Sequence, residues 1–271
     1  MKKHISTILL FLILIIGLSL LLYPTFADWW NDMHSSRAIS NYDSIMANMS
    51  DEDYNHLFDA ARDYNDRLRQ LEFPLMYYDQ VEGYEDLLNI TSSGIMGYIH
   101  IPKIDVKLPI YHGTSEGVLQ IAAGHMQGTS LPTGGRNTHC AISAHRGLPS
   151  ARLFTDLDDL IVGDTFTLSV VDRMMTYQVD QILIVDPADV EALYVTEGED
   201  YCTLVTCTPD GINSHRMLVR GTRIENEGEA KQIRVSADAI QIEPVLVAPF
   251  VAAPMLFLLL ILLLIPKKRR G

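Results

Sequence analysis

Two long apolar runs, one near each end of the chain, place the strongest constraint on how these 271 residues can fold. Residues 5–23 and residues 245–265 form runs of 19 and 21 residues, and neither run contains a charge. A helix rises about 1.5 Å per residue, so each run is long enough to cross the ~30 Å hydrocarbon core of a bilayer. We therefore expect an N-terminal transmembrane anchor over residues 1–24 and a C-terminal transmembrane helix over 245–266.

A cleaved signal peptide is the alternative for the first run. Its apolar stretch is longer than that of most signal peptides, and only a poor cleavage-like site, Thr25-Phe26-Ala27, follows it. Basic residues flank both runs on their outer sides, at residues 2–3 and in the tail 267–271. Positive flanks stay in the cytosol, so both termini are expected to be cytoplasmic and the region between the runs extracellular, at the plasma membrane.

The region between the apolar runs is strongly acidic. The chain has 34 acidic and 21 basic residues, and all the acidic residues lie between the runs, whereas six of the basic ones lie in the tails. An acidic surface argues against nucleic acid as a partner, since such binding needs a basic footprint. With only three cysteines in the whole chain, a disulfide-dense scaffold is also excluded.

Helices are expected between the N-terminal anchor and residue 94. Residues 25–71 form a helical region, in which Ser50 and Asp53 have the spacing of a capping box. Apolar residues there recur every three or four positions, as on one face of a helix: Tyr54, Leu57, Ala61, Tyr64, Leu68 and Leu71. Residues 72–93 then contain Pro74, Gly83 and many polar residues, which indicates a lid, a flap or a linker.

After Gly94 the pattern changes to short β-type runs separated by turn residues. Seven strands are expected, at residues 95–101, 107–111, 139–144, 165–171, 175–185, 201–206 and 217–224. Short helical connections are expected at 115–123, 151–160 and 188–193. This pattern predicts a single mainly-β domain over residues 94–226, either a barrel or a sandwich, followed by a linker over 227–244.

Three reactive side chains lie at the expected strand ends. Cys207 ends one strand immediately before a turn signal, and Arg216 begins the next strand nine residues later. His145 directly follows another strand. A thiol, an imidazole and a guanidinium gathered at one sheet edge would suit nucleophilic acyl transfer. A cysteine packed in the core and an arginine on the surface remain the simpler alternatives.

Several stretches resemble sortases. The segment TLVTCTPDGINSHR, residues 203–216, closely resembles the TLxTC…R signature of that family. Four further segments match in order: GYIHIP at 97–102, LPIYHGTS at 108–115, GHMQGTSLP at 124–132 and AHRGLPSARLFTDL at 144–157. These segments are similar to class C, the pilin-polymerising sortases of Gram-positive bacteria. The resemblance implies an eight-stranded sortase β-barrel.

The resemblance also implies a role for each reactive residue. The Cys207 thiolate attacks the Thr carbonyl of an LPxTG-like sorting signal, and Arg216 donates to the developing oxyanion. His145 protonates the departing Gly amine and then accepts a proton from the incoming amine, which class C sortases take from a pilin lysine. No metal is implied for class C, no residue spacing requires one, and no cofactor is expected.

The remaining cysteines and most histidines are expected to be structural. His112 and His125 fall in motif positions that suit turns, and His215 should point to the face opposite Arg216. Cys140 and Cys202 each lie five residues before His145 and Cys207, so each faces away from its reactive partner. They are either two small core residues or, as a second possibility, neighbours joined in an extracellular disulfide.

The segment before the barrel departs from the class C pattern. Class C sortases usually carry a lid with an Asp-Pro-aromatic motif, whereas this chain has FPLMYYDQV at residues 73–81. Asp79 could still pair with Arg216, and Tyr77 or Tyr78 could still cover Cys207. We expect a weakened or atypical lid, and an open linker is the alternative.

Together these features predict a membrane-anchored cysteine transpeptidase that builds covalent pili from subunits with LPxTG-like signals. The first alternative is a cell-wall-anchoring sortase that uses a peptidoglycan amine as its acceptor. The second is a non-catalytic scaffold that keeps the barrel, for which Cys207, His145 and Arg216 would not be needed.

Overall fold

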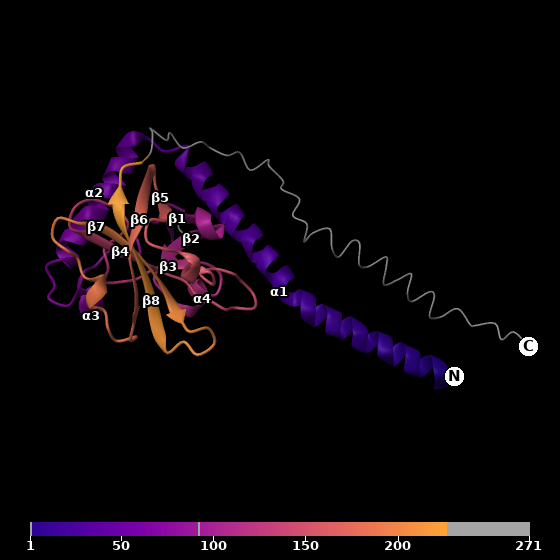
Figure 1. Ribbon diagram of the computed structural model, residues 1–271. Coiled ribbons are helices and arrows are strands. Elements are labelled where there is room, and N and C mark those ends of the chain that lie inside the picture. Colours follow the sequence, from indigo (N-terminus) through magenta and orange to yellow (C-terminus); the bar gives the residue numbers. More distant parts are fainter. Residues whose placement is uncertain (1, 92, 227–271) are drawn as a thin grey trace, which may run out of the picture. The chain divides into compact units, whose positions relative to one another are not determined.

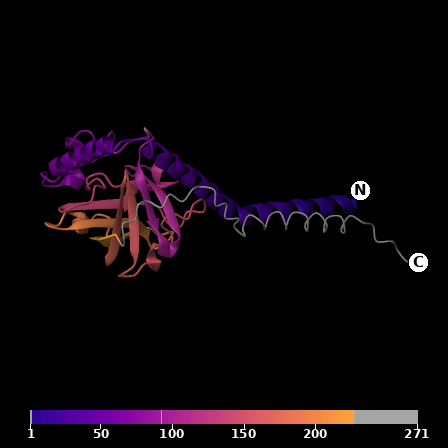
Figure 2. The same ribbon diagram turned by 90° about the horizontal axis from the view of Figure 1, so that it is seen from above.

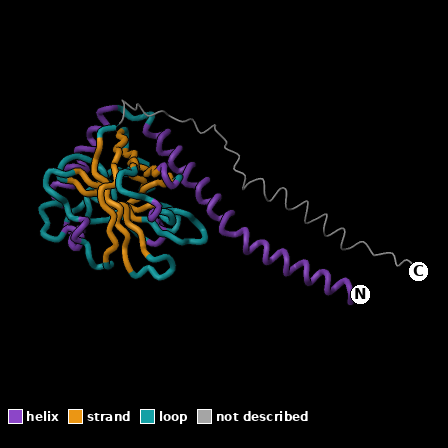
Figure 3. The backbone as a smooth tube through the Cα atoms, in the orientation of Figure 1, coloured by secondary structure: helices purple, strands orange, loops and turns teal. Residues whose placement is uncertain are grey.

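The computed structural model describes residues 2–91 and 93–226, and its eight strands close into one barrel (Figure 1). The strands are β1 (Ile95–Ile101), β2 (Val106–His112), β3 (Ala123–His125), β4 (Thr138–Ser143), β5 (Thr165–Val170), β6 (Arg173–Val185), β7 (Asp200–Thr208) and β8 (His215–Ile224). Their order around the barrel is β1-β2-β3-β4-β7-β8-β6-β5, and β5 pairs with β1 to close it. The expected eight-stranded barrel is confirmed, and Figure 3 shows its strands in orange.

Two of the strand pairs are parallel, β2 with β3 and β4 with β7, and the other pairs are antiparallel. Parallel neighbours need a crossover connection, and antiparallel neighbours can be joined by a short turn. The strands β7 and β8 are joined by such a short loop, residues 209–214. This combination gathers the ends of β4 and β7 and the start of β8 at one edge of the barrel.

The strand β3 is the one strand that the sequence pattern did not predict. It has three residues, and its first residue, Ala123, falls within the helical connection predicted over 115–123, of which only α4 (Glu116–Leu119) is helical. A Cβ on Gly124 would lie 2.2 Å from the carbonyl oxygen of Gly113, so this pairing depends on glycine. A strand of three residues with a glycine at its centre is too short to show the alternation of apolar and polar residues by which a strand is recognised in a sequence.

The other predicted connections are also less helical than expected. The segment 151–160 contains only the 3₁₀ turn η3 (Leu157–Asp159), and 188–193 contains only η4 (Glu191–Leu193). A further 3₁₀ turn, η2 (Pro102–Ile104), joins β1 to β2.

The first helix, α1 (Lys2–Met46), is continuous through Pro24, so the chain does not break at the end of the expected anchor. Its apolar N-terminal part makes α1 the one helix in the described residues that is long and apolar enough to cross a membrane. The predicted second span over 245–266, the linker 227–244 and the tail 267–271 lie outside the described residues.

The C-terminal part of α1 packs on the barrel through Tyr42, which is 1% exposed. Its hydroxyl donates to the carbonyl oxygen of Met96 at 2.8 Å and accepts from the amide of Val171 at 2.8 Å. One side chain therefore links α1 to β1 and to the β5–β6 turn.

The second helix, α2 (Asp51–Leu68), begins at the expected capping box, with Ser50 and Asp53 bonded to each other's backbone amides. Its predicted apolar face is confirmed: Ala61, Tyr64 and Leu68 are buried in the same core as the barrel. Figure 2 shows this helix lying along one side of the strands. The amide of Asn65 completes the contact, since it donates to the Leu131 carbonyl oxygen and accepts from the Leu131 amide.

The segment after α2 is packed against the barrel and is not an open linker. It contains the single turn α3 (Pro74–Tyr77) and the 3₁₀ turn η1 (Tyr78–Gln80). Tyr84 and Leu88, which follow these two turns in the sequence, are buried. The Tyr84 hydroxyl accepts from the Gly113 amide at 2.9 Å and lies 2.9 Å from Nδ1 of His125, so it fastens this segment to β3.

The Asn65→Ala variant tests the contact between α2 and the barrel. It leaves the buried amide of Leu131 without its acceptor, so we expect the free energy of unfolding to fall by about 1–3 kcal/mol. The matched control is Asn55→Ala, at an exposed position of the same helix, which should leave stability unchanged or slightly higher. Thermal unfolding compares the stability of the two variants. Equal melting temperatures for Asn65→Ala and Asn55→Ala would contradict the prediction.

Candidate active site

The parallel pairing of β4 and β7 brings the chain after β4 next to the end of β7. Ser143 lies opposite Val205 in the register. Beyond it, the Ala144 amide donates to the Val205 carbonyl oxygen at 3.2 Å, and the buried Thr206 hydroxyl donates back to the Ala144 carbonyl oxygen at 2.9 Å. These two bonds hold the residue that follows, His145, beside the end of β7.

The antiparallel pairing of β7 and β8 places Cys207 directly opposite Arg216. Directly opposed residues of antiparallel strands have their Cβ atoms about 4.5–5.5 Å apart on the same face of the sheet. The short loop between these strands therefore returns the chain so that Arg216 stands beside Cys207 on the neighbouring strand. Nη1 of Arg216 donates to the carbonyl oxygens of Asn213 and His215, at 3.1 and 3.0 Å.

Cys207, His145 and Arg216 all line one cavity of about 250 Å³. Its walls are mainly apolar: Leu119, Met126, Val185, Val190, Leu193, Val205 and Leu218. Cys207 itself is partly exposed, so a molecule in the cavity can reach the sulfur. The three residues that the sequence singled out thus share one solvent-accessible site.

A carboxylate from α4 faces the imidazole. Oε2 of Glu116 lies 3.5 Å from Nε2 of His145, whose side chain is 26% exposed. The pKa of Glu116 is lowered, first by a hydrogen bond from Gln120 and then by the neighbouring imidazole. Glu116 therefore presents a carboxylate to the imidazole of His145. This residue is not among those predicted from the sequence, although it directly follows the 108–115 motif and lies in the expected helical connection over 115–123.

Arg146 joins the loop that carries His145 to the loop that follows Cys207 and strand β7. Its side chain is only 7% exposed and pairs with Asp158, 3.1 Å from Nη2, and with Asp210 in the turn after Cys207. Burial alone would lower the pKa of Arg146, but the two carboxylates outweigh burial and raise it. The guanidinium therefore remains positively charged and joins Asp158 to Asp210.

The other histidines have the structural roles that the sequence predicted, or lie outside the cavity. His112 bonds to the carbonyl oxygens of Gly94 and Leu87, and the fully buried His125 bonds to Tyr84 and Ser130. His215 does not line the cavity. Within residues 2–91 and 93–226, no group of three His, Cys, Asp or Glu side chains is arranged to hold a metal ion.

Cys140 and Cys202 are opposite each other on the parallel strands β4 and β7. Both are buried and both are free thiols. Burial, together with the neighbouring Cys140, raises the pKa of Cys202 well above its ordinary value. Of the two possibilities left open above, the structure has the pair of small core residues and not the disulfide.

The lid contacts that the sequence left possible are not formed. Arg216 has no ion pair among the described residues, and none of Asp79, Tyr77 and Tyr78 lines the cavity. Tyr77 is 43% exposed, and Tyr78 packs against the main core.

One residue of this segment, Leu75, packs next to the site, although the sequence pattern does not single it out. It packs against the apolar cluster that contains the cavity residues Leu193, Val205 and Leu218. Gly128 permits this approach, because a Cβ there would lie 2.6 Å from the Cα of Leu75. The segment that contains Leu75 shows no sequence pattern for this contact, because the contact depends on a glycine elsewhere in the chain.

Comparison with known proteins identifies the family. The Sortase domain model matches residues 99–224. The structure is similar to sortase C1 from Streptococcus agalactiae, at 49% identity with a TM-score of 0.66, over 70% of this chain and 100% of that one. The chain belongs to the sortase family.

Other relatives extend this result. Sortase C from Streptococcus pneumoniae is 43% identical over 70% of this chain and 97% of that one, with a TM-score of 0.63. Sortase A of Streptococcus agalactiae serotype III is 33% identical over 50% of this chain and 55% of its own length, so the chain spans about half of that curated relative. The expected resemblance to class C sortases is confirmed. Sortases are cysteine transpeptidases.

The Arg146→Gln variant tests the bridge behind the site. Without the guanidinium, the loop that carries His145 and the loop after Cys207 lose the ion pair that joins them, and we expect kcat to fall at least about tenfold, equivalent to ~1.4 kcal/mol. Arg152→Gln is the matched control, since Arg152 pairs with Asp156 in the same connection and does not line the cavity. Turnover within about twofold of wild type in both variants would show that the bridge has no part in positioning.

The Asp79→Ala variant tests the absent lid contact. Because Asp79 does not pair with Arg216, the alkylation rate of Cys207 by a small thiol reagent should stay within about twofold of wild type. Glu82→Ala, which removes an exposed carboxylate from the same segment, should also leave the alkylation rate of Cys207 within about twofold of wild type. Faster labelling in Asp79→Ala alone would restore an inhibitory role for Asp79.

Proposed function

We propose that this sortase is a membrane-anchored class C enzyme that cleaves an LPxTG-like sorting signal between Thr and Gly and joins the Thr to a pilin lysine. The observation that carries the proposal is the single cavity lined by Cys207, His145 and Arg216. Its apolar walls suit the Leu and Pro side chains of such a signal, and the sulfur is accessible at its edge. No cofactor takes part in the proposed reaction.

The first half of the reaction forms a thioester. The Cys207 thiolate attacks the Thr carbonyl carbon, and the negative charge develops on the carbonyl oxygen. Arg216 uses Nη1 for the two main-chain oxygens, which leaves Nε and Nη2 free to donate to that oxyanion. Loss of one such donor typically costs about 2.7–4 kcal/mol of barrier. Protonated His145, facing Glu116, then gives its proton to the departing Gly amine.

The second half regenerates the thiolate. The neutral imidazole of His145 accepts a proton from the incoming lysine ε-amine, and the amine nitrogen attacks the thioester carbon. The C–S bond breaks, the Cys207 thiolate leaves and a new amide bond remains. An amine competes with water only when it is bound next to the thioester, so acceptor binding decides between transfer and hydrolysis.

Helix α1 supports attachment to a membrane, since its apolar window has the length and composition of a bilayer span. Basic residues at both ends of the sequence favour cytoplasmic termini and an extracellular barrel. On this arrangement the enzyme acts outside the cell and next to the membrane. Pilin subunits with LPxTG-like signals are the proposed partners, by similarity to sortase C of Streptococcus pneumoniae, whose structure is described as providing insights into catalysis and pilin substrate specificity.

The Cys207→Ala variant tests this function directly. The full chain in detergent micelles is incubated with candidate pilins, and covalent ladders are followed on denaturing gels. We expect ladders with the wild type and none with Cys207→Ala. Arg216→Gln should lower kcat by about two orders of magnitude, because one oxyanion donor group is lost.

Cys202→Ala is the matched control, since it removes a buried thiol from the same strand outside the cavity. It should retain the ladders if the protein remains folded. Transfer to a peptidoglycan-like amine without any pilin ladder would instead support a cell-wall-anchoring sortase. No cleavage of any LPxTG-like peptide would support a non-catalytic scaffold.

A further inference from the structure

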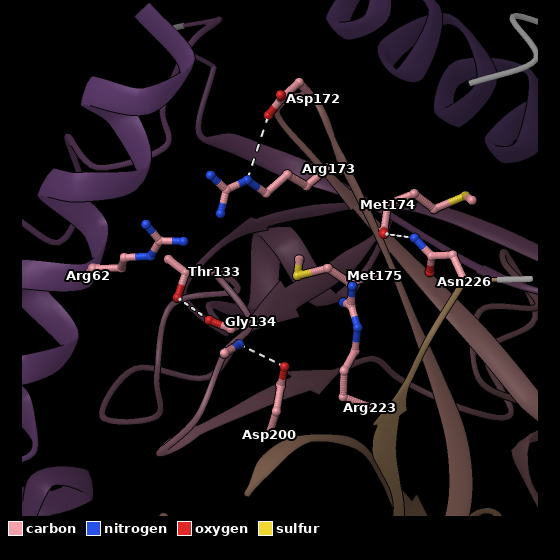
Figure 4. A pocket seen from close by; sticks show the side chains of 11 residues that line it. Arg62, Thr133, Gly134, Asp172, Arg173, Met174, Met175, Asp200, Arg223 and Asn226 are labelled. Atoms are coloured by element: carbon pink, nitrogen blue, oxygen red, sulfur yellow. Dashed lines mark hydrogen bonds and ion pairs between the residues drawn. The ribbon is translucent and has the colours of Figure 1, made fainter. Parts of the chain in front are cut away.

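A second and larger cavity, of about 740 Å³, lies at the other end of the barrel from the active site (Figure 4). It includes Asp200, the first residue of β7, whereas Cys207 lies seven residues further along the same strand. Seven residues of a strand span about 23 Å. The proposed reaction therefore makes no use of this cavity.

Three arginines from three different elements line the cavity: Arg62 from α2, Arg173 from the start of β6 and Arg223 from β8. Figure 4 shows their guanidinium groups directed toward the same space. Such a gathering of positive charge is unusual in a region where acidic residues greatly outnumber basic ones.

These arginines are poorly neutralised by the protein. Nη1 of Arg223 is buried and has no hydrogen-bond partner among the described residues. Nε of Arg173 lies 3.9 Å from Asp172, too far for a hydrogen bond, and its guanidinium stacks 3.7 Å from the centre of the Phe58 ring. Arg62 pairs at 3.4 Å with Asp59, a carboxylate whose side chain is 74% exposed.

Two carboxylates line the cavity, Asp172 and Asp200, and Asp200 is already occupied by neutral donors. Asp200 accepts from the Gly135 amide at 2.7 Å, the Tyr177 hydroxyl at 3.0 Å and the Thr138 hydroxyl at 3.4 Å. It makes no ion pair with Arg223. Burial, and after it the charge of Arg62, lowers the pKa of Arg173, and the carboxylates of Asp172 and Asp59 offset this shift only in part.

We propose that this cavity binds a phosphate ester through Arg62, Arg173 and Arg223. A buried guanidinium donor without an acceptor costs free energy, and a bound anion would supply that acceptor. A phosphate ester presents several tetrahedral oxygens and can receive donors from three directions, whereas one arginine is enough to bind a planar carboxylate through both oxygens. The volume has room for a phosphorylated glycerol-sized group in addition to the phosphate.

The test uses the full chain in uncharged detergent micelles, titrated with inorganic phosphate and with glycerol 3-phosphate at constant ionic strength. We expect saturable binding by calorimetry, and at least tenfold weaker binding in Arg223→Gln. Arg67→Gln is the matched control, because Arg67 lies on α2 like Arg62 but outside the cavity, and its binding should equal wild type. An unchanged alkylation rate of Cys207 verifies that each variant is folded.

A second arm identifies the source of the phosphate. The full chain is placed in vesicles of phosphatidylcholine alone or mixed with phosphatidylglycerol, and phosphate is added to both. If a lipid headgroup fills the cavity, phosphate binding is lost only in the mixed vesicles; if a soluble ester is the ligand, binding persists in both. Either result supports the proposal.

Three results would overturn it. These are no saturable binding of either phosphate compound, wild-type affinity in Arg223→Gln, or equally tight binding of succinate. The test does not depend on the transpeptidase reaction, so its failure leaves the proposed function untouched.

Discussion

The pairing of β7 with its two neighbours is the constraint on which the rest of this sortase depends. On one side β7 runs parallel to β4, and on the other it runs antiparallel to β8. Parallel strands end at the same edge, and an antiparallel partner starts where its neighbour ends. This mixed pairing therefore delivers an imidazole, a thiol and a guanidinium to one edge from three separate stretches of sequence. A shift of one residue in the β7–β8 register would move Arg216 to the opposite face from Cys207.

The same strands also define the opposite end of the barrel. There β7 begins at Asp200, β6 begins at Arg173, and β8 approaches its end at Arg223. Helix α2 covers this region and adds Arg62, held in place by Asn65 and by the buried face of the helix. The two ends thus differ in chemistry: one cavity is apolar with a nucleophile, and the other is lined by arginines.

Much of the barrel and of the site could be predicted from the sequence. Seven strands were detectable because their residue patterns and turn signals are local properties. Cys207, Arg216 and His145 could be selected because each adjoins a strand end, and the motif resemblance pointed to the same three. By contrast β3 was missed, since three residues around a glycine form no pattern. The possible lid contacts of Asp79, Tyr77 and Tyr78 are not formed, since the orientation of that segment follows from packing at Leu75, Gly128 and Tyr84.

The sequence by itself determined which segments are apolar, which are strands, and which reactive side chains stand at their ends, because these depend on neighbouring residues in the chain. Only the tertiary structure decided which of those ends meet. Strand order and register placed Cys207 opposite Arg216 and Cys140 opposite Cys202, and they gathered Arg62, Arg173 and Arg223 around one cavity. Residues more than a hundred positions apart become neighbours only when the barrel closes, and the free energy that selects this closure comes from burying the whole core at once.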